Sequence, residues 1–211
     1  MTLNHRSFAG VNAAVLTPVT DDLLPNDALM VDYSKWLLAN GCNGLAILGT
    51  TGEANSFSLK ERIRIIENLI EGGVPAEILM PGTGACSITD AIELTKMAVN
   101  AGVGGVLMLP PWYYKNPSDA GLFRFFSEVI QRVSDHRLQI YLYHFPQMSA
   151  TPITYNLIEM LLKSYPDVVT GMKDSSGDLE NMAGAAERFP GFEVMAGAEH
   201  CFYPLLKRGG A

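Results

Sequence analysis

The sequence is poor in cysteine, in clustered positive charge and in long apolar runs. Its three cysteines, Cys42, Cys86 and Cys201, lie far apart and form no CxxC motif, which argues against a disulfide framework and against a zinc site. The formal net charge is -7 over 211 residues with no Lys/Arg cluster, so nucleic acid and anionic membranes are poor candidate partners. Every apolar run is short and interrupted, so no segment is expected to span a bilayer.

Nucleotide-binding and targeting motifs are missing as well. The chain contains neither a GxGxxG turn nor a Walker loop, and its first residues, MTLNHRSFAG, lack the apolar core of a signal peptide. The composition is that of an ordinary globular protein, with 48% hydrophobic and 18% charged residues. Together with unpaired cysteines, these features predict a cytoplasmic protein.

What the sequence does contain is a recurring pattern, in which a short apolar run ends in Gly, Thr, Pro or Tyr and an amphipathic stretch follows. Continuous apolarity is typical of parallel strands buried on both faces. The spacing is roughly 25–35 residues, the size of one strand-plus-helix unit. The runs lie at 11–18, 44–53, 77–85, 105–114, 139–146, 168–177 and 192–200.

Helix signals fill the stretches between these runs. Ser58 and Glu61 form a capping-box pattern at the start of one such stretch. The apolar face predicted for that helix consists of Leu59, Ile63, Ile66 and Ile70. No linker or low-complexity segment divides the chain, so residues 1–211 are predicted to form a single domain.

Alternating strands and helices fit either a doubly wound sheet or a (β/α)₈ barrel, also called a TIM barrel. Polar and aromatic residues end several successive strands here, as a ring of loops requires, whereas a doubly wound sheet concentrates its ligand groups at one switch point. The pattern therefore favours the barrel. Only seven units are visible, and barrels typically run to about 250 residues. We expect a barrel truncated after the seventh βα unit, with the eighth strand onward missing.

Lys173 stands at the end of the apolar run VVTGMKDSSGD, where a cation needs an explanation. In one interpretation its charge is neutralised by an ion pair with Asp174. In the other, burial lowers its pKa, and the neutral amine attacks a ketone to form a Schiff base.

Two further elements end neighbouring strands. Tyr143, in IYLYHFP, is expected to point into the same mouth as Lys173, where a phenol could move protons; the alternative is a buried tyrosine bonded to backbone. Thr50 and Thr51, in LGTTGE, offer hydroxyls and nearby backbone N–H groups that suit a carboxylate; the alternative is a tight turn.

These motifs occur in the order GTTGE, PPWYYKNPS, YHFP, GMKDSSGD and MAGAE. In order and spacing the sequence resembles the pyruvate-dependent class I aldolases. This superfamily contains dihydrodipicolinate synthase, N-acetylneuraminate lyase and 2-keto-3-deoxygluconate aldolase. The resemblance covers essentially the whole chain and implies a (β/α)₈ barrel that assembles as a homotetramer or homodimer.

The resemblance also implies residue roles. Lys173 matches the Schiff-base lysine, Tyr143 the proton-relay tyrosine, and Thr50 the relay hydroxyl. Thr50 with Thr51 matches the pocket for the pyruvate carboxylate. Tyr114 aligns best with the tyrosine that reaches into the neighbouring subunit's site in many members. Tyr113, one residue earlier, is the alternative match.

Two positions near the end of the chain are matched in the same way. Gly197 corresponds to a backbone contact beside the substrate, and Glu199 to a position where sugar-cleaving members bind hydroxyls.

The sequence departs from the family at YHFPQM. Synthase members commonly read Y-N-x-P-x-R, with an arginine that binds a carboxylate of the second substrate. Here His144 replaces the asparagine, and Met148 stands where that arginine would be. Because His144 neighbours Tyr143 in a strand, it is expected to point to the other face and to have a structural role.

The sequence thus predicts a metal-free, cofactor-free lyase acting on pyruvate, or another 2-oxo acid, together with an aldehyde that is sugar-derived or uncharged. No cofactor is needed, because the imine itself is the electron sink. A dihydrodipicolinate synthase, a dehydratase of 2-keto-3-deoxy sugar acids and a silent sensor of 2-oxo acids remain as alternatives.

Overall fold

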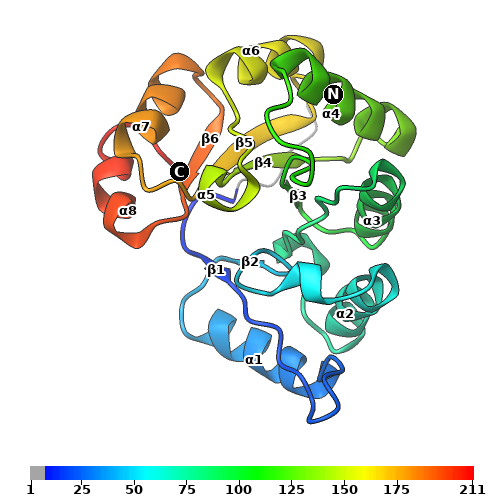
Figure 1. The fold of residues 1–211 in the computed structure, drawn as a ribbon. Coiled ribbons are helices and arrows are strands. Elements are labelled where there is room, and N and C mark those ends of the chain that lie inside the picture. The colour runs from blue at the N-terminus through cyan, green and yellow to red at the C-terminus, as the bar shows by residue number, and fades with distance from the viewer. Residues whose placement is uncertain (1–7) are drawn as a thin grey trace. The chain divides into compact units, whose positions relative to one another are not determined.

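The chain folds into alternating strands and helices, which confirms the predicted α/β class (Figure 1). The computed structural model describes residues 8–211. The strands are β1 (Asn12–Ala14), β2 (Gly44–Ala46), β3 (Val106–Met108), β4 (Ile140–His144), β5 (Val169–Asp174) and β6 (Glu193–Ala196). The helices are α1 (Asp27–Ala39), α2 (Leu59–Glu71), α3 (Ile88–Asn100), α4 (Asp119–Val133), α5 (Pro146–Ser149), α6 (Tyr155–Ser164), α7 (Leu179–Arg188) and α8 (Glu199–Leu206), with 3-10 turns at Ala54–Ser56 and Ala76–Ile78.

Two compact units can be distinguished. The first unit comprises the chain up to Thr83 together with Glu93–Val106, and the second comprises Gly84–Ile92 together with Leu107–Ala211. Each is described by itself below. Within residues 8–211, no helix has the length and apolar character needed to cross a bilayer.

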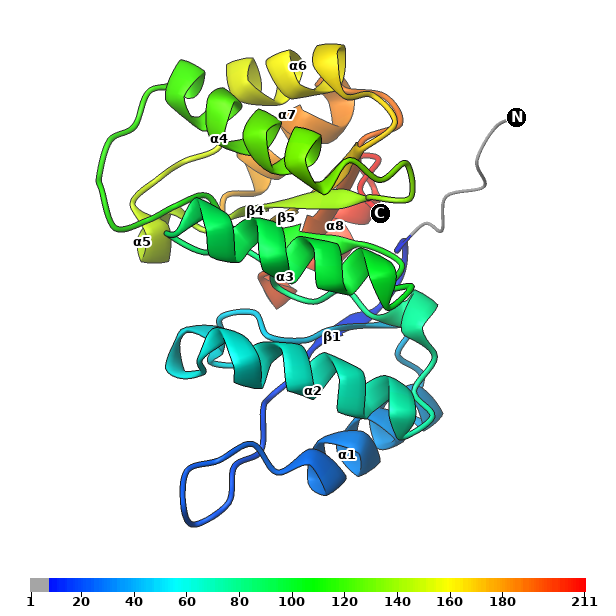
Figure 2. The ribbon, with the colours of Figure 1, turned by 90° about the vertical axis from the view of Figure 1, so that its right-hand side faces the viewer.

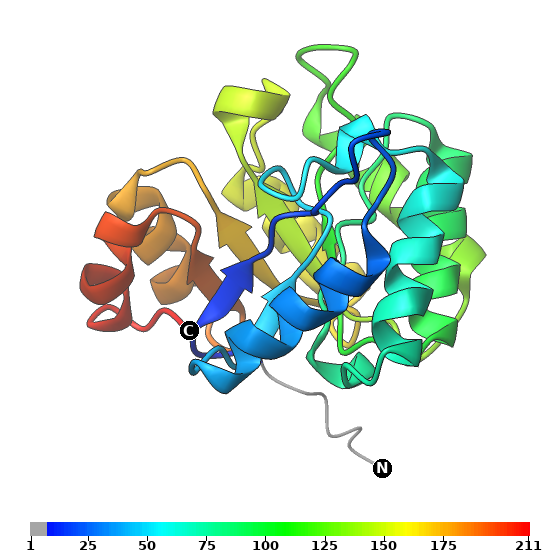
Figure 3. The same cartoon turned by 90° about the horizontal axis from the view of Figure 1, so that it is seen from below.

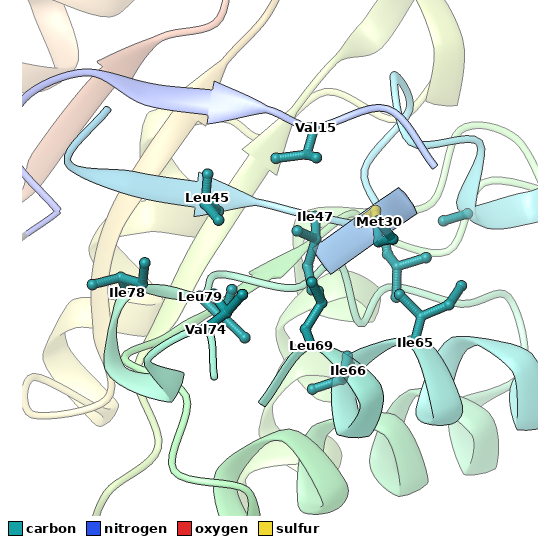
Figure 4. Close-up of a cluster of buried hydrophobic side chains, with 12 residues drawn as sticks. Val15, Met30, Leu45, Ile47, Ile65, Ile66, Leu69, Val74, Ile78 and Leu79 are labelled. Atoms are coloured by element: carbon teal, nitrogen blue, oxygen red, sulfur yellow. The ribbon is translucent and has the colours of Figure 1, made fainter. Parts of the chain in front are cut away.

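In the first unit, β1 and β2 pair in parallel, and an apolar core lies between these strands and the helices α1 and α2 (Figure 4). Burying such side chains contributes roughly 1.5–3 kcal/mol each, so this cluster is the main source of stability in the unit. The side chains labelled in Figure 4 are Val15, Met30, Leu45, Ile47, Ile65, Ile66, Leu69, Val74, Ile78 and Leu79.

The apolar run at 77–85 continues this sheet without forming a regular strand. Leu79 makes a parallel bridge to Leu45, and the N–H groups of Met80 and Gly82 donate to carbonyls of the β2 segment. Pro81, between those two donors, has no N–H, and the 3-10 turn occupies the residues before Leu79. The structure therefore shows six strands among residues 8–211 where the sequence predicted seven.

Helix α2 begins with the predicted capping box, in which Ser58 and Glu61 bond reciprocally. The buried face, however, is rotated from the predicted one. Arg62 is 6% exposed and donates to the carbonyl of Gly82 at 2.8 Å, and this bond turns its side of the helix inward. The buried residues are Arg62, Ile65, Ile66 and Leu69.

The second unit is built on a four-stranded sheet of order β3-β4-β5-β6, whose pairs β4–β5 and β5–β6 are parallel. Helices α4, α6 and α7 lie on one side of the sheet in Figure 2, and α7 and α8, coloured orange and red in Figure 3, lie beside β6. Because side chains alternate along a strand, every second residue of β4, β5 and β6 faces these helices. The remaining residues point to the opposite face, where the candidate site lies.

Candidate active site

Lys173 and Tyr143 are direct neighbours on adjacent parallel strands. Their Cα atoms are register partners in the β4–β5 pair, and Met195 of β6 is the next partner in the same row. The Lys173 Nζ lies 4.9 Å from the centre of the Tyr143 ring. The structure thus brings together the two residues that the sequence singled out first.

The environment of the Lys173 amine disfavours its charged form. Burial lowers the pKa of Lys173 below its usual 10.5. The ring of Tyr143, itself only 5% exposed, lies over the amine in a cation–π contact that favours the ammonium, so the lowered pKa comes from burial and not from the ring. An amine with a lowered pKa is neutral in a larger fraction of molecules and is therefore a better nucleophile.

Asp174 is not the partner of Lys173. Its side chain is fully buried on the opposite face of β5, where one carboxylate oxygen accepts the Ser176 N–H at 2.8 Å and the other accepts the Asn181 amide at 2.7 Å. Over residues 8–211, no ion pair includes Lys173. The ion-pair interpretation of Lys173 is therefore wrong for this geometry, and the interpretation as a nucleophile agrees with it.

His144 has the structural position that the sequence predicts. It is the register partner of Asp174, on the face turned away from Lys173, and is 6% exposed. Its Nδ1 accepts the backbone N–H of Ile153 at 3.0 Å, so the neutral ring carries its proton on Nε2. Burial lowers the pKa of His144, against the opposing effect of Asp174 and Asp178.

The GTTGE loop belongs to the first unit and is shaped by close backbone contacts. A Cβ at Gly52 would lie 2.8 Å from the carbonyl oxygen of Val15, and the Thr17 hydroxyl donates to the Gly52 carbonyl at 2.7 Å. Thr50 and Thr51 are both exposed.

Not every backbone donor of this loop is available to a ligand. The N–H groups of Glu53 and Ala54 donate to the carbonyls of Thr50 and Gly49. Any carboxylate bound here would therefore depend on the two hydroxyls and on the remaining N–H groups.

The other predicted site residues lie at the ends of strands in the second unit. Tyr113 and Tyr114, after β3, are 71% and 84% exposed and touch edge to face, with centroids 5.1 Å apart. Met148, in α5 after β4, is 57% exposed.

Two predicted residues follow β6. Glu199 is exposed in the first turn of α8. The Gly197 N–H donates to the Asp174 carbonyl at 2.7 Å and is therefore not available to a ligand. A Cβ at Gly197 would lie 2.0 Å from the Ser175 hydroxyl and 3.0 Å from the Asp174 carbonyl oxygen, so a side chain there would require Ser175 to move.

Sequence reasoning missed one polar pair beside this site. The Tyr141 hydroxyl donates to a carboxylate oxygen of Glu193 at 2.8 Å, on the same face as Lys173. The sequence signal for this pair was weak, because it consisted of Tyr141 in the apolar run 139–146 and Glu193 in the apolar run 192–200.

A row of paired strand residues that places a desolvated lysine beside a tyrosine is typical of a class of protein that can form imines with carbonyl compounds. The model of the dihydrodipicolinate synthetase family matches residues 7–211. The chain is 35% identical over 204 residues to an uncharacterized DapA-like lyase of Chloroflexus aurantiacus, covering 96% of this chain and 67% of that protein. It belongs to the dihydrodipicolinate synthetase family.

Solved structures of members of this family resemble the chain as well. A dihydrodipicolinate synthase from Agrobacterium tumefaciens is 31% identical, with a TM-score of 0.92 over 95% of this chain and 70% of its own. YagE, a member of the same family from E. coli solved in complex with pyruvate, is 28% identical, with a TM-score of 0.86 over 95% of this chain and 67% of its own. The family resemblance predicted from the motifs is therefore confirmed. The chain spans about two thirds of the length of the curated relatives it matches.

The buried imidazole of His144 predicts a pH dependence of stability. Its pKa in the folded protein lies below 6.5, so the unfolded chain takes up the proton first as the pH falls. The free energy of unfolding should therefore drop once the pH falls below about 6.5, until the folded-state pKa is passed. His144→Asn keeps an acceptor for the Ile153 N–H and removes the titration, so it should lose this part of the pH dependence.

Denaturant unfolding between about pH 7.5 and about pH 5.5 measures the difference. His136→Asn is the matched control, because the His136 side chain is 75% exposed. An unchanged pH slope in His144→Asn would contradict the assignment.

Proposed function

We propose that the protein is a class I lyase that forms a Schiff base between Lys173 and the ketone of pyruvate or another 2-oxo acid. The observation that carries this proposal is the partly buried amine of Lys173, which has a lowered pKa, faces the ring of Tyr143 and forms no ion pair within residues 8–211. Membership of the family supports it, as does the pyruvate bound to the related YagE.

The chemistry follows from the neutral amine. Its lone pair attacks the ketone carbon, and the carbinolamine that forms loses water once its hydroxyl is protonated. The resulting iminium withdraws electrons from the neighbouring carbon, so a proton can leave there to give an enamine. The enamine adds to an aldehyde, or is released from one in the reverse direction, and water then frees the lysine.

Tyr143 and Thr50 are the proposed proton carriers in these steps. Tyr143 stands beside the amine that gains and loses protons, which supports its role. The family resemblance supports Thr50 as the relay hydroxyl, and Thr50 with Thr51 as the groups that hold the pyruvate carboxylate. Gly197 is the proposed backbone contact beside the substrate.

The second substrate is proposed to be an uncharged, sugar-derived aldehyde. Met148 presents an exposed apolar side chain in α5, after β4, and such a side chain offers no charge to an acceptor carboxylate. Glu199, exposed at the start of α8, offers a carboxylate that can bind hydroxyl groups. The second candidate is dihydrodipicolinate synthesis from pyruvate and aspartate semialdehyde, which the names of the relatives favour.

We further propose that residues 1–211 are part of one (β/α)₈ barrel domain whose eighth strand and following segment lie outside this sequence. The greater length of the relatives supports this. A homotetramer or homodimer is proposed, with Tyr114 reaching into a neighbouring subunit's site, because Tyr114 is 84% exposed in the segment that follows β3. A cytoplasmic location stays a prediction.

The first prediction here concerns the nucleophile. Borohydride reduces an imine to a stable secondary amine, so treatment with pyruvate and borohydride should leave a covalent adduct on the peptide that contains Lys173. Mass spectrometry locates the adduct. Lys173→Arg should abolish it, whereas Lys163→Arg, which alters an exposed lysine of α6, should not. An adduct on another lysine would overturn the mechanism.

The next prediction concerns the proton relay. Tyr143→Phe removes one hydroxyl and keeps the ring beside Lys173, so the fold should persist while kcat falls by about 10²–10⁴. Tyr165→Phe is the control, since the Tyr165 hydroxyl bonds to exposed Gln131. Steady-state kinetics measure both variants. A kcat near that of the wild type in Tyr143→Phe would assign Tyr143 to the core alone.

The last prediction of this section concerns the aldehyde. An arginine binds a carboxylate with charge-assisted hydrogen bonds that contribute about 1.5–3 kcal/mol. Met148→Arg should therefore shift the preference toward aspartate semialdehyde by up to ~10–100-fold in kcat/KM. Met148→Leu, which stays apolar, should not.

Competition between aspartate semialdehyde and glyceraldehyde, with pyruvate saturating, measures that preference. If the wild type already prefers aspartate semialdehyde, another cation binds its carboxylate and the synthase function replaces the one proposed here.

A further inference from the structure

One row beneath Lys173, the same face of the sheet carries a tyrosine, a glycine and a glutamate. Tyr141, Gly171 and Glu193 are register partners on β4, β5 and β6, two residues before the row of Tyr143, Lys173 and Met195. Side chains two residues apart in a strand point to the same face. Tyr141 and Glu193 therefore share a face with the amine.

Tyr141 and Glu193 form a bridge across β5. The Tyr141 hydroxyl donates to Glu193 Oε2 at 2.8 Å, and Tyr141 is fully buried. The bridge crosses β5 at Gly171, where a Cβ would lie 2.9 Å from the Tyr141 ring and 2.3 Å from the Glu193 carbonyl oxygen. Only a residue without a side chain leaves room for this contact.

The Glu193 and Lys173 side chains are long enough for the carboxylate and the amine to meet. Two residues along a strand and one strand across separate the two positions by about 8 Å. A carboxylate and an ammonium on long side chains can close such a gap. The bond to Tyr141 instead directs the carboxylate toward β4, and no ion pair forms with Lys173 among residues 8–211.

Within the described part of the second unit, other titratable groups around this row are few. Asp174 and His144 lie on the opposite face of the sheet. The strand β3 and the short helix α5 carry no titratable side chain, while Glu199 and His200 are exposed in α8. Besides the phenols of Tyr141 and Tyr143, Glu193 is the titratable group that β4, β5 and β6 present on the face of Lys173.

We propose that Tyr141 is a positioning residue that holds the Glu193 carboxylate away from the Lys173 amine, so that the amine stays without an ion-pair partner. Its importance for catalysis rests on the proposed function, in which Lys173 must be neutral to attack a ketone. An ion pair would stabilise the ammonium form and slow that attack.

The test measures the protonation of Lys173 directly. Competitive acetylation with limiting acetic anhydride labels only neutral amines, and mass spectrometry of the peptide containing Lys173 gives the labelling midpoint as the pH is varied. No pyruvate is added. The variants are Tyr141→Phe, Glu193→Gln and the double variant, with Tyr155→Phe as the control that removes a hydroxyl bonded to the Asn181 carbonyl on the helix side. Circular dichroism checks that each is folded.

Tyr141→Phe removes the hydrogen bond that directs the carboxylate toward β4, so the Lys173 midpoint should rise by about one to three pH units. The rise should vanish in the double variant, and Tyr155→Phe should show none. No rise in folded Tyr141→Phe, or an equal rise in the double variant, would overturn the proposal. If Tyr141→Phe does not fold, Glu193→Gln decides. A Lys173 midpoint that falls by less than about one pH unit relative to the wild type supports the proposal. A larger fall shows that the carboxylate already acts on the amine and overturns the proposal.

This outcome is separate from the fate of the proposed function. The labelling reports the amine whether or not it ever forms an imine. If borohydride traps no pyruvate adduct while Tyr141→Phe raises the midpoint, the lyase function fails and the positioning role of Tyr141 stands. If the adduct forms and the midpoint does not move in Tyr141→Phe, the lyase function stands and the positioning role of Tyr141 fails.

Discussion

The second unit depends on one constraint, a partly buried amine that forms no ion pair within residues 8–211. The chain has to place a lysine among apolar neighbours and also keep every nearby carboxylate away from it. Alternation along β5 does the first part, because it sends Lys173 to one face and Asp174 to the other. Asp174 is then satisfied by Ser176 and Asn181, so its charge stabilises the turn into α7 and not the ammonium of Lys173.

The close packing at the end of β5 holds the three strands of the candidate site in register. Gly197 donates to the Asp174 carbonyl, and its missing side chain lets β6 approach Ser175. The Ser175 N–H in turn donates to the His144 carbonyl on β4. Three strands are thereby joined at one level by backbone bonds. Their register, and with it the pairing of Tyr143 with Lys173, is held just where the side chains of the candidate site begin.

The sequence predicted those parts of the fold that follow from local patterns. Lys173 and Tyr143 could be recognised because each ends an apolar run and because parallel strands end at the same edge of a sheet. The capping box of α2 could be read from Ser58 and Glu61 for the same reason, since its bonds are local. The choice between the two interpretations of Lys173 was different, because it depended on Asn181, a helix residue that binds Asp174 from the next element.

Features that depend on register or on a single distant bond could not be predicted. The β4–β5 pairing shifts between Ile140 and Tyr141, and a slip of one residue would exchange the two faces of a strand. The contact of Tyr141 with Glu193, 52 residues away, exists only in the shifted register. The buried face of α2 is similar, because its apolar residues allow two orientations and the bond from Arg62 to Gly82 selects one.

The division of the site between strands and loops has a consequence for substrate choice. Lys173 and Tyr143 lie within strands whose register is fixed by backbone bonds, so the part of the site proposed to form the imine is rigidly defined. Met148, Tyr114 and Glu199 lie beyond the strand ends and are exposed, and no backbone ladder fixes them. Side chains in such positions can differ in charge and size without a cost to the sheet. The residues beyond the strand ends are therefore where we expect differences in the choice of acceptor, because changes there leave the sheet intact.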